Sequence, residues 1–172
     1  GNGSCLAGIW KGFKELKKLG IIGRLPKMVS AGIEHASPVY RAVQRQQTDR
    51  PVACDLDRLD PTDAGIGSII VAEEGYDSPE AAKAVLQSGG LATVVNTDDI
   101  RRAMVTFLEK ERDTALAHGI LPEPVSYISL AAIGDLPVQP DDVVVSVITG
   151  HGLKARETTD DLLAGRPDLR EV

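Results

Sequence analysis

The segment at residues 142–148, DVVVSVI, restricts the fold more than any other part of the sequence, because five of its seven residues are β-branched aliphatics. Val and Ile favour strands, since their branched side chains pack well on a pleated surface. A strand that is apolar on both faces is typical of a parallel sheet covered by helices. The segment therefore predicts a buried strand and, with it, an α/β fold.

The rest of the chain alternates helical and strand patterns, as an α/β fold requires. Residues 5–19 repeat apolar side chains on one helical face. Ser4, Ser78 and Thr97 stand where helix N-caps are expected. The pattern at 63–72 leaves helix and strand open. The other predicted helices span residues 38–45, 78–89, 98–118, 125–133 and 159–164, and the other strands span residues 27–33 and 91–96.

The composition is that of a globular domain, or of one piece of a larger one. The 172 residues carry a net charge of −6, which argues against binding to a nucleic-acid backbone. Two Phe, three Tyr and one Trp are too few for a platform that stacks single-stranded bases. No apolar run approaches the roughly 18 residues of a membrane span. Cys5 and Cys54 are too few for a disulfide scaffold, which predicts a cytoplasmic location.

The first candidate site is the sequence Gly1-Asn2-Gly3-Ser4, directly before the first predicted helix. Glycines let a ligand approach the backbone closely, and a helix N-terminus adds unpaired N–H groups and the positive end of the dipole. These features suit a phosphate. The alternative is a glycine-rich loop that simply caps the helix. The motif matches neither the P-loop nor the dinucleotide fingerprint.

The second candidate site is Thr149-Gly150-His151-Gly152, at the carboxyl end of the predicted strand, where open α/β sheets bind their ligands. A hydroxyl between small residues can reach a ligand without obstruction. A strand-ending turn capped by the threonine is the alternative. His151 shares no ligand spacing with the other histidines or the cysteines, so no metal site is predicted.

The third candidate is Glu123-Pro124-Val125-Ser126, at the start of a predicted helix. A carboxylate near a helix N-terminus interacts favourably with the helix dipole. Capping is therefore favoured over catalysis for Glu123.

Taken together, the motifs resemble the carboxyl-terminal half of threonine synthase, a fold-type-II enzyme that depends on pyridoxal phosphate (PLP). The resemblance covers residues 1–154. Its most specific part is TGHGLK after the apolar segment, and the GNGS loop is the second. In order along the chain, the matching pieces are GNGS, LAGIWKGFKEL, GIEHASPVYRA, EPVSYISLAAI and VVVSVITGHGLK.

The resemblance implies a fold similar to the tryptophan synthase β subunit. That fold has a three-layer, open, mostly parallel sheet flanked by helices, and residues 1–172 would form part of its large, cofactor-binding domain, with 155–172 as a polar tail. The cofactor would be PLP, and Thr149 would place its hydroxyl at the pyridine nitrogen. The implied reaction is that of a lyase, which converts O-phosphohomoserine to threonine and phosphate. The residues that would cradle the cofactor phosphate are Gly1, Asn2, Gly3, Ser4 and Cys5.

The family's catalytic lysine, which forms the Schiff base with PLP, has no matching motif in this sequence. Lys14 lies on the predicted solvent face of the first helix, and Lys154 lies in the GHGLK turn, so neither is a good candidate. The sequence thus names no catalytic residue, and the chain alone is expected to be inactive. It begins inside the phosphate loop, which predicts a second half of an enzyme.

The expected partners are an amino-terminal half or companion chain that carries the lysine, an amino-acid substrate and a second copy in a homodimer. Neither nucleic acid nor a membrane is expected as a partner. Two alternatives stay open. One is another PLP reaction on the same fold, such as threonine dehydration or β-replacement to make cysteine or cysteate. The other is a non-catalytic remnant that binds a phosphate-bearing ligand, or only a partner, and it would explain the missing lysine and the bulky Tyr127.

Overall fold

The computed structural model describes residues 2–59, 66 and 74–169. The chain divides into two compact units, each described separately below. The first comprises Gly1–Asp60 and Ile70–Val94, and the second comprises Pro61–Ile69 and Val95–Val172. The segment 63–72, which the sequence left open between helix and strand, lies outside the described residues except for the helical, buried Ile66.

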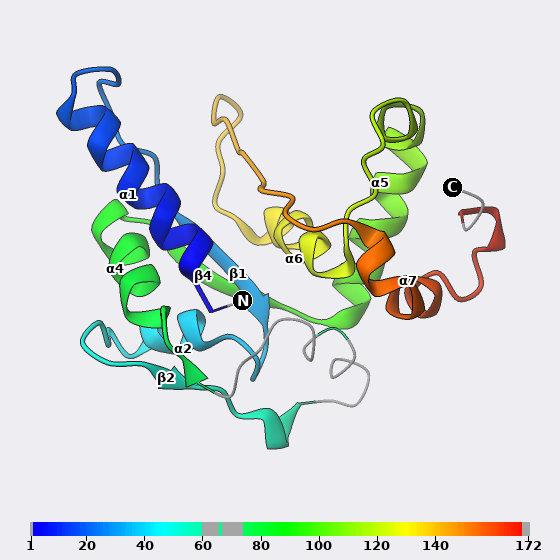
Figure 1. Cartoon of the computed structure of the whole chain (residues 1–172), viewed down its shortest axis with the longest axis horizontal. Coiled ribbons are helices and arrows are strands. Elements are labelled where there is room, and N and C mark those ends of the chain that lie inside the picture. Colours follow the sequence, from blue (N-terminus) through cyan, green and yellow to red (C-terminus); the bar gives the residue numbers. More distant parts are fainter. Residues whose placement is uncertain (1, 60–65, 67–73, 170–172) are drawn as a thin grey trace. The chain divides into compact units, whose positions relative to one another are not determined.

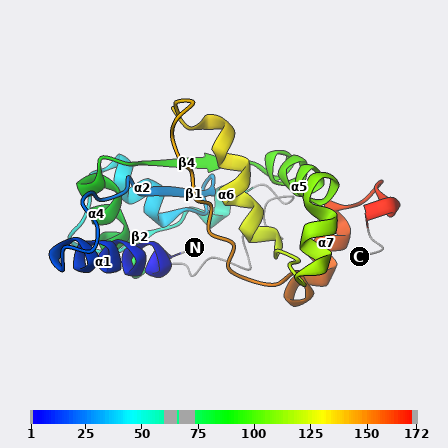
Figure 2. The same ribbon diagram turned by 90° about the horizontal axis from the view of Figure 1, so that it is seen from above.

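The first unit is an α/β arrangement, as predicted (Figure 1). Strands β1 (Val29–Ile33) and β4 (Leu91–Val95) run side by side in the same direction and form a two-stranded sheet (Figures 1 and 2). A second, antiparallel pair joins β2 (Val52–Ala53) to β3 (Glu74–Gly75), with Val52 opposite Gly75. The helical elements of the unit are α1 (Ser4–Lys18), α2 (Pro38–Gln44), the short η1 (Leu56–Arg58) and α4 (Ser78–Ser88).

Small side chains let α4 pack against both α1 and α2. Ala81, Ala82 and Ala84 on α4 are completely buried, which allows a close approach of the neighbouring helices. Trp10 of α1 packs with Ala84 and Met28, and this contact anchors one face of α1. The helix predicted at residues 5–19 is therefore confirmed. Leu6, Ile9 and Trp10 of its apolar face pack as predicted, whereas Leu16 at the other end of that face is exposed.

The second unit is mainly helical in the part of the chain that the structure describes. The long α5 (Thr97–Ala117) packs against α6 (Tyr127–Ala131). The ring of Phe107 meets the ring of Tyr127 edge to face, with centroids 5.8 Å apart. The other elements of this unit are η2 (Pro124–Ser126), η3 (Ala132–Asp135), η4 (Gly152–Ala155), α7 (Arg156–Leu162) and η5 (Pro167–Leu169).

The N-caps differ from those predicted. At α5 the capping side chain is Asn96, whose Oδ1 accepts from the Asp99 N–H at 2.9 Å, while Asp99 Oδ2 accepts from the Asn96 N–H at 3.1 Å. This reciprocal pair is a capping box. Thr97 is the first residue of the helix instead. Ser78 likewise lies inside α4, and its hydroxyl accepts from the Val52 N–H at 3.1 Å.

The prediction of a buried strand at residues 142–148 is wrong. The segment forms no regular element, and Val143 and Val145 are 89% and 80% exposed. Neither sheet in the described part of the chain includes it. The β-branched side chains favour an extended backbone, but a strand also needs a neighbour for its N–H and C=O groups. Thr149 therefore follows an exposed extended segment.

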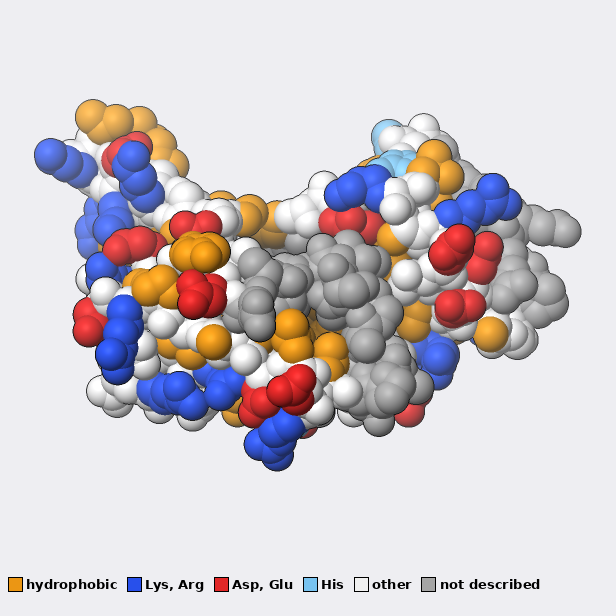
Figure 3. All heavy atoms as spheres, turned by 60° about the horizontal axis from the view of Figure 1, so that its bottom comes forward, with side chains coloured by type: hydrophobic (Ala, Val, Ile, Leu, Met, Phe, Trp, Pro, Cys, Tyr) orange, Lys and Arg blue, Asp and Glu red, His pale blue; other side chains and the backbone are white. Residues whose placement is uncertain are grey.

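Among the described residues, no helix combines the length and the apolar character that crossing a lipid bilayer requires. On the face shown in Figure 3, Lys and Arg side chains are interspersed with Asp and Glu in the described parts of the surface.

Candidate functional site

The first candidate site lies at the N-terminus of α1, in the first unit. Gly3 is the N-cap residue and has a φ of 104°, a left-handed conformation that favours glycine. A Cβ at position 3 would lie 2.5 Å from the Ala81 Cβ and 3.0 Å from Val39 Cγ2. Position 3 therefore requires glycine on two counts, and its missing side chain lets α1 begin directly against α2 and α4.

The backbone at the start of α1 is rich in hydrogen-bond donors. The first helical bond runs from the Ala7 N–H to the Gly3 carbonyl, at 2.9 Å. The N–H groups of residues 3–6 therefore have no acceptor within the helix. The positive end of the helix dipole lies at the same place. This donor set suits a phosphate or a similar anion.

The side chains of the loop have different environments. Asn2 Oδ1 is buried and has no hydrogen-bond partner among the described residues. The Ser4 hydroxyl donates to the Asp77 carboxylate, and it makes no capping bond to α1, contrary to the prediction. Cys5 is exposed, and Gly1 lies outside the described residues.

Asp77 is a residue that the sequence analysis missed. Its carboxylate pairs with Ser4, which is 73 residues away in the chain, so no local pattern could have linked the two. A carboxylate beside the start of a helix interacts favourably with the helix dipole. It also places a negative charge beside the donors that an anion would use.

The second candidate site surrounds Thr149, in the second unit. Its hydroxyl donates to Glu123 Oε1 at 3.4 Å, and its N–H donates to Ser126 Oγ at 3.2 Å. Lys154 Nζ lies 3.2 Å from the second carboxylate oxygen, Glu123 Oε2. Thr149 is exposed, whereas Glu123 is only 5% exposed. Within the described ranges, the buried carboxylate therefore has one neutral and one cationic side-chain donor.

Backbone bonds hold the Thr149 loop against the chain before η2. The Glu123 N–H donates to the Gly150 carbonyl at 3.0 Å, and the Gly152 N–H donates to the Leu121 carbonyl at 2.6 Å. A Cβ at Gly150 would lie 1.9 Å from Glu123 Oε1. The glycine is thus required because the carboxylate lies directly against the loop backbone.

Glu123 does not play the capping role that the sequence favoured. It occupies the N-cap position of η2, but its side chain makes no capping bond there. The carboxylate contacts Thr149 and Lys154 instead. A Glu before a helix start is typical of a cap, and nothing in the sequence points to a partner 26 residues further along the chain.

His151 has a local structural contact. Its Nδ1 accepts from the Leu153 N–H at 3.2 Å and caps η4. Within the described ranges, no three His, Cys, Asp or Glu side chains are grouped so that they could hold a metal ion.

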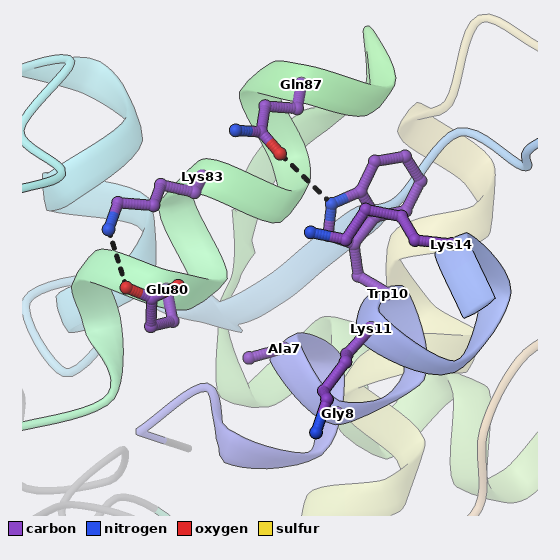
Figure 4. Close-up of a pocket in the computed structure, with 8 residues that line it drawn as sticks. All are labelled: Ala7, Gly8, Trp10, Lys11, Lys14, Glu80, Lys83 and Gln87. Atoms are coloured by element: carbon purple, nitrogen blue, oxygen red, sulfur yellow. Dashed lines mark hydrogen bonds and ion pairs between the residues drawn. The ribbon is translucent and has the colours of Figure 1, made fainter. Parts of the chain in front are cut away.

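A groove of about 460 Å³ lies between α1 and α4, within the first unit (Figure 4). Trp10 Nε1 donates to Gln87 Oε1 at 3.3 Å on one side, and the Lys14 Nζ lies 5.8 Å from the centre of the Trp10 ring. Lys83 pairs with Glu80 at 2.6 Å. These contacts engage Lys14, Lys83 and Glu80, and Lys11 lies 3.9 Å from Glu15 on its own helix. No predicted cofactor-binding residue lines the groove.

Comparison with known proteins adds the deciding observation. The family model described as "Pyridoxal-phosphate dependent enzyme" matches residues 1–150. The chain belongs to this family. Membership in the PLP-dependent enzymes confirms the resemblance found in the sequence, the α/β fold class and PLP as the cofactor.

Curated relatives of this PLP-dependent chain carry the name threonine synthase. The protein of Methanocaldococcus jannaschii is 32% identical over 158 residues, which cover 90% of this chain and 36% of the relative. That of Methanosarcina acetivorans is 30% identical over 166 residues, which cover 94% of this chain and 38% of the relative. The chain therefore spans well under half the length of these relatives.

The two sites offer a PLP enzyme different groups. The start of α1 supplies backbone N–H donors, and the Thr149 loop supplies a hydroxyl held by a buried carboxylate. The two lysines considered in the sequence are both engaged, since Lys14 lies over Trp10 and Lys154 pairs with Glu123.

Proposed function

We propose that this chain is the carboxyl-terminal, cofactor-binding part of a threonine synthase-like lyase, which converts O-phosphohomoserine to threonine and phosphate in the cytoplasm. Relatives named threonine synthase match at least 90% of the chain and support the reaction class. The observation that carries the proposal is the start of α1. There, a member of a PLP-dependent family presents unpaired N–H donors beside a position that requires glycine, which supports the binding of an anion.

The cofactor phosphate would bind to the loop of Gly1, Asn2, Gly3, Ser4 and Cys5. The N–H groups that precede the first helical bond of α1 fit a phosphate dianion, which accepts hydrogen bonds. The Asn2 side chain also fits. Its buried Oδ1 has no partner among the described residues, and rotating the terminal amide by about 180° would place Nδ2, a donor, at the same position.

Thr149 would contact the pyridine nitrogen of the cofactor. The loop that carries it is held by backbone bonds to Leu121 and Glu123, so the hydroxyl has a defined position in its own unit. When bound, PLP supplies an electron sink that permits elimination of phosphate and addition of water at the substrate. The chain's own contribution is to bind and orient the two ends of the cofactor.

The lysine that anchors the cofactor would come from an amino-terminal segment or a companion chain. The engaged positions of Lys14 and Lys154 support this assignment. The exposed valines at 143 and 145 support it too, because an apolar extended segment gains stability by pairing with another strand. We propose that the missing segment pairs with residues 142–148.

The bulky Tyr127 does not favour a non-catalytic remnant. Its side chain is completely buried and packs against Phe107 of α5, so its bulk fills the core of the second unit.

The test is a fusion in which all 172 residues follow the amino-terminal segment of the M. jannaschii threonine synthase and replace its matching region. Intact M. jannaschii threonine synthase, taken through the same assays, is the control. Both are assayed with O-phosphohomoserine, threonine, O-acetylserine and O-phosphoserine. We expect the fusion to bind PLP and to release phosphate from O-phosphohomoserine with formation of threonine.

Two results would contradict the proposal. A PLP-loaded fusion that consumes threonine, O-acetylserine or O-phosphoserine but not O-phosphohomoserine would assign another reaction of the family. A folded fusion that takes up no PLP, while intact M. jannaschii threonine synthase does, would identify a non-catalytic remnant.

A further inference from the structure

The groove between α1 and α4 has no role in the proposed function, and its charges are unbalanced. Among the described residues, three lysines and one glutamate line it. Lys11 and Lys14 belong to α1 and Lys83 belongs to α4, so both walls supply cations (Figure 4). Glu80 supplies the carboxylate. The groove is therefore positively charged, in a chain whose net charge is −6.

The size and the charge of the groove define a class of ligand. A volume of about 460 Å³ is enough for a metabolite-sized molecule. Lysine ammonium groups are mobile point charges that bind phosphate. We propose that the groove binds a small anion with two or more phosphate groups, which Lys14 and Lys83 contact from the two walls. This site is separate from the start of α1, where the cofactor phosphate would bind.

The ion pairs of the groove lysines can be exchanged at little cost. Lys11 lies 3.9 Å from Glu15, and both side chains are largely exposed. Lys83 pairs with Glu80 at 2.6 Å, but the Glu80 side chain is also largely exposed. Ion pairs in contact with water contribute little to stability. An anion that enters the groove can therefore engage these ammonium groups without disturbing the packing of the two helices.

The floor of the groove is fixed and leaves room for a ligand. Trp10 is buried, and its Nε1 donates to Gln87 Oε1 at 3.3 Å, which joins α1 to α4. At Gly8, no described residue comes within 4 Å of a Cβ. The Lys14 Nζ lies 5.8 Å from the centre of the Trp10 ring, and Lys14 is exposed. A ligand that contacts Lys14 therefore changes the surroundings of the Trp10 ring.

The sequence has one tryptophan, so tryptophan fluorescence reports on this groove. The experiment titrates the 172-residue chain with inorganic pyrophosphate at low ionic strength and records the emission of Trp10. We expect a saturable change, with a higher affinity than for inorganic phosphate, because two phosphate groups can contact lysines of both walls at once. Lys83→Gln should weaken pyrophosphate binding about three- to tenfold, since it removes one cation from the site.

Two matched controls separate the groove from the general charge of the chain. Gly8→Leu places a side chain in the groove and should abolish the response of Trp10 to pyrophosphate. Gly12→Leu, at a position of α1 that also has open space around its Cβ but does not line the groove, should retain it. Lys18→Gln removes the same charge as Lys83→Gln from the end of α1, outside the groove, and should leave the affinity nearly unchanged. Circular dichroism shows whether each variant is folded.

Three results would overturn the proposal. One is a parent chain whose emission shows no saturable response to pyrophosphate. Another is a folded Gly8→Leu variant that responds like the parent, which would place the anion elsewhere, such as at the start of α1. The third is an equal loss of affinity in Lys18→Gln and Lys83→Gln. If Gly8→Leu does not fold, the comparison of these two lysine variants decides. None of these results depends on PLP uptake by the fusion, so the proposed function is tested separately.

Discussion

At the scale of single residues, Gly150 has the tightest steric requirement around the Thr149 loop. A Cβ there would lie 1.9 Å from a carboxylate oxygen of Glu123. We expect Gly150→Ala to lower the free energy of unfolding by about 1–3 kcal/mol, because the carboxylate or the loop must move. Urea denaturation measures the effect. Gly134→Ala is the control, since no described residue comes within 4 Å of a Cβ there, and an equal loss in both variants would contradict the prediction.

Tyr127 has a buried hydroxyl without a hydrogen-bond partner among the described residues. Removing it by Tyr127→Phe should leave the free energy of unfolding at pH 7 unchanged or raise it by about 1 kcal/mol. Burial also raises the pKa of the Tyr127 phenol above its ordinary range. The Tyr127 phenol therefore ionises at a lower pH in the unfolded chain than in the folded chain. As the pH rises above about 10, this ionisation favours the unfolded chain and lowers the free energy of unfolding.

The measurement for Tyr127 is a series of denaturation curves at increasing pH. The parent chain should lose more stability between neutral and alkaline pH than Tyr127→Phe. If the free energy of unfolding falls equally with pH in the two proteins, the Tyr127 phenol has the same pKa in the folded and unfolded chains, and the prediction is wrong.

Asp77 affects the anion site at the start of α1. Its carboxylate accepts from Ser4 and repels an incoming phosphate. We expect Asp77→Asn to increase phosphate affinity up to about tenfold, which corresponds to about 1.4 kcal/mol in the free energy of binding. Titration of the chain with inorganic phosphate at low ionic strength tests this. Glu80→Asn, which removes an exposed carboxylate elsewhere on α4, is the control, and unchanged affinity in the Asp77 variant would contradict the expectation.

At the scale of elements, helices were more predictable than their caps. The periodic apolar residues of α1 and α5 predict both helices to within two residues at each end. The predictions of the N-cap residues were wrong because several neighbouring polar residues can cap a helix, and tertiary contacts determine which of them does. The Ser4 hydroxyl donates to Asp77, and the Ser78 hydroxyl accepts from the Val52 N–H, both within the first unit.

The capping box of α5 gives a direct test at this scale. Asn96→Ala should lower the free energy of unfolding by about 1 kcal/mol, because the Asp99 N–H loses its acceptor. Thr106→Ala, at an exposed position in the middle of the same helix, should change it by less. Equal losses for the two substitutions, measured by urea denaturation, would show that Asn96 does not cap α5.

The segment 142–148 shows why strands are harder to predict than helices. A helix satisfies its backbone groups locally, whereas a strand depends on a neighbour that the local sequence does not specify. The Glu123–Thr149 contact belongs to the same class, because it joins residues that are distant in sequence. By contrast, the loop before α1 was predictable, since glycine and serine precede the periodic apolar pattern of that helix. The candidate site at Thr149 was predicted from the end of a strand that does not form, so its contacts with Glu123 could not be foreseen.

At the scale of the whole molecule, the exposed valines should control association. Val145 is 80% exposed, so Val145→Lys should leave the unfolding curve unchanged while it weakens binding to the amino-terminal segment supplied in trans. Sedimentation velocity measures the association. Leu19→Lys, at a 73% exposed position at the end of α1, is the control. Equal association of the parent and the Val145 variant would contradict pairing through this segment.

The contact of Gly3 with Ala81 and Val39 has a consequence for binding energetics. Helix packing within the first unit determines where α1 begins, so the conformational entropy of the loop is already lost when the protein folds. An arriving phosphate would not have to order its donors. Preorganisation of this kind raises affinity without any additional contact, because binding then carries a smaller entropic cost.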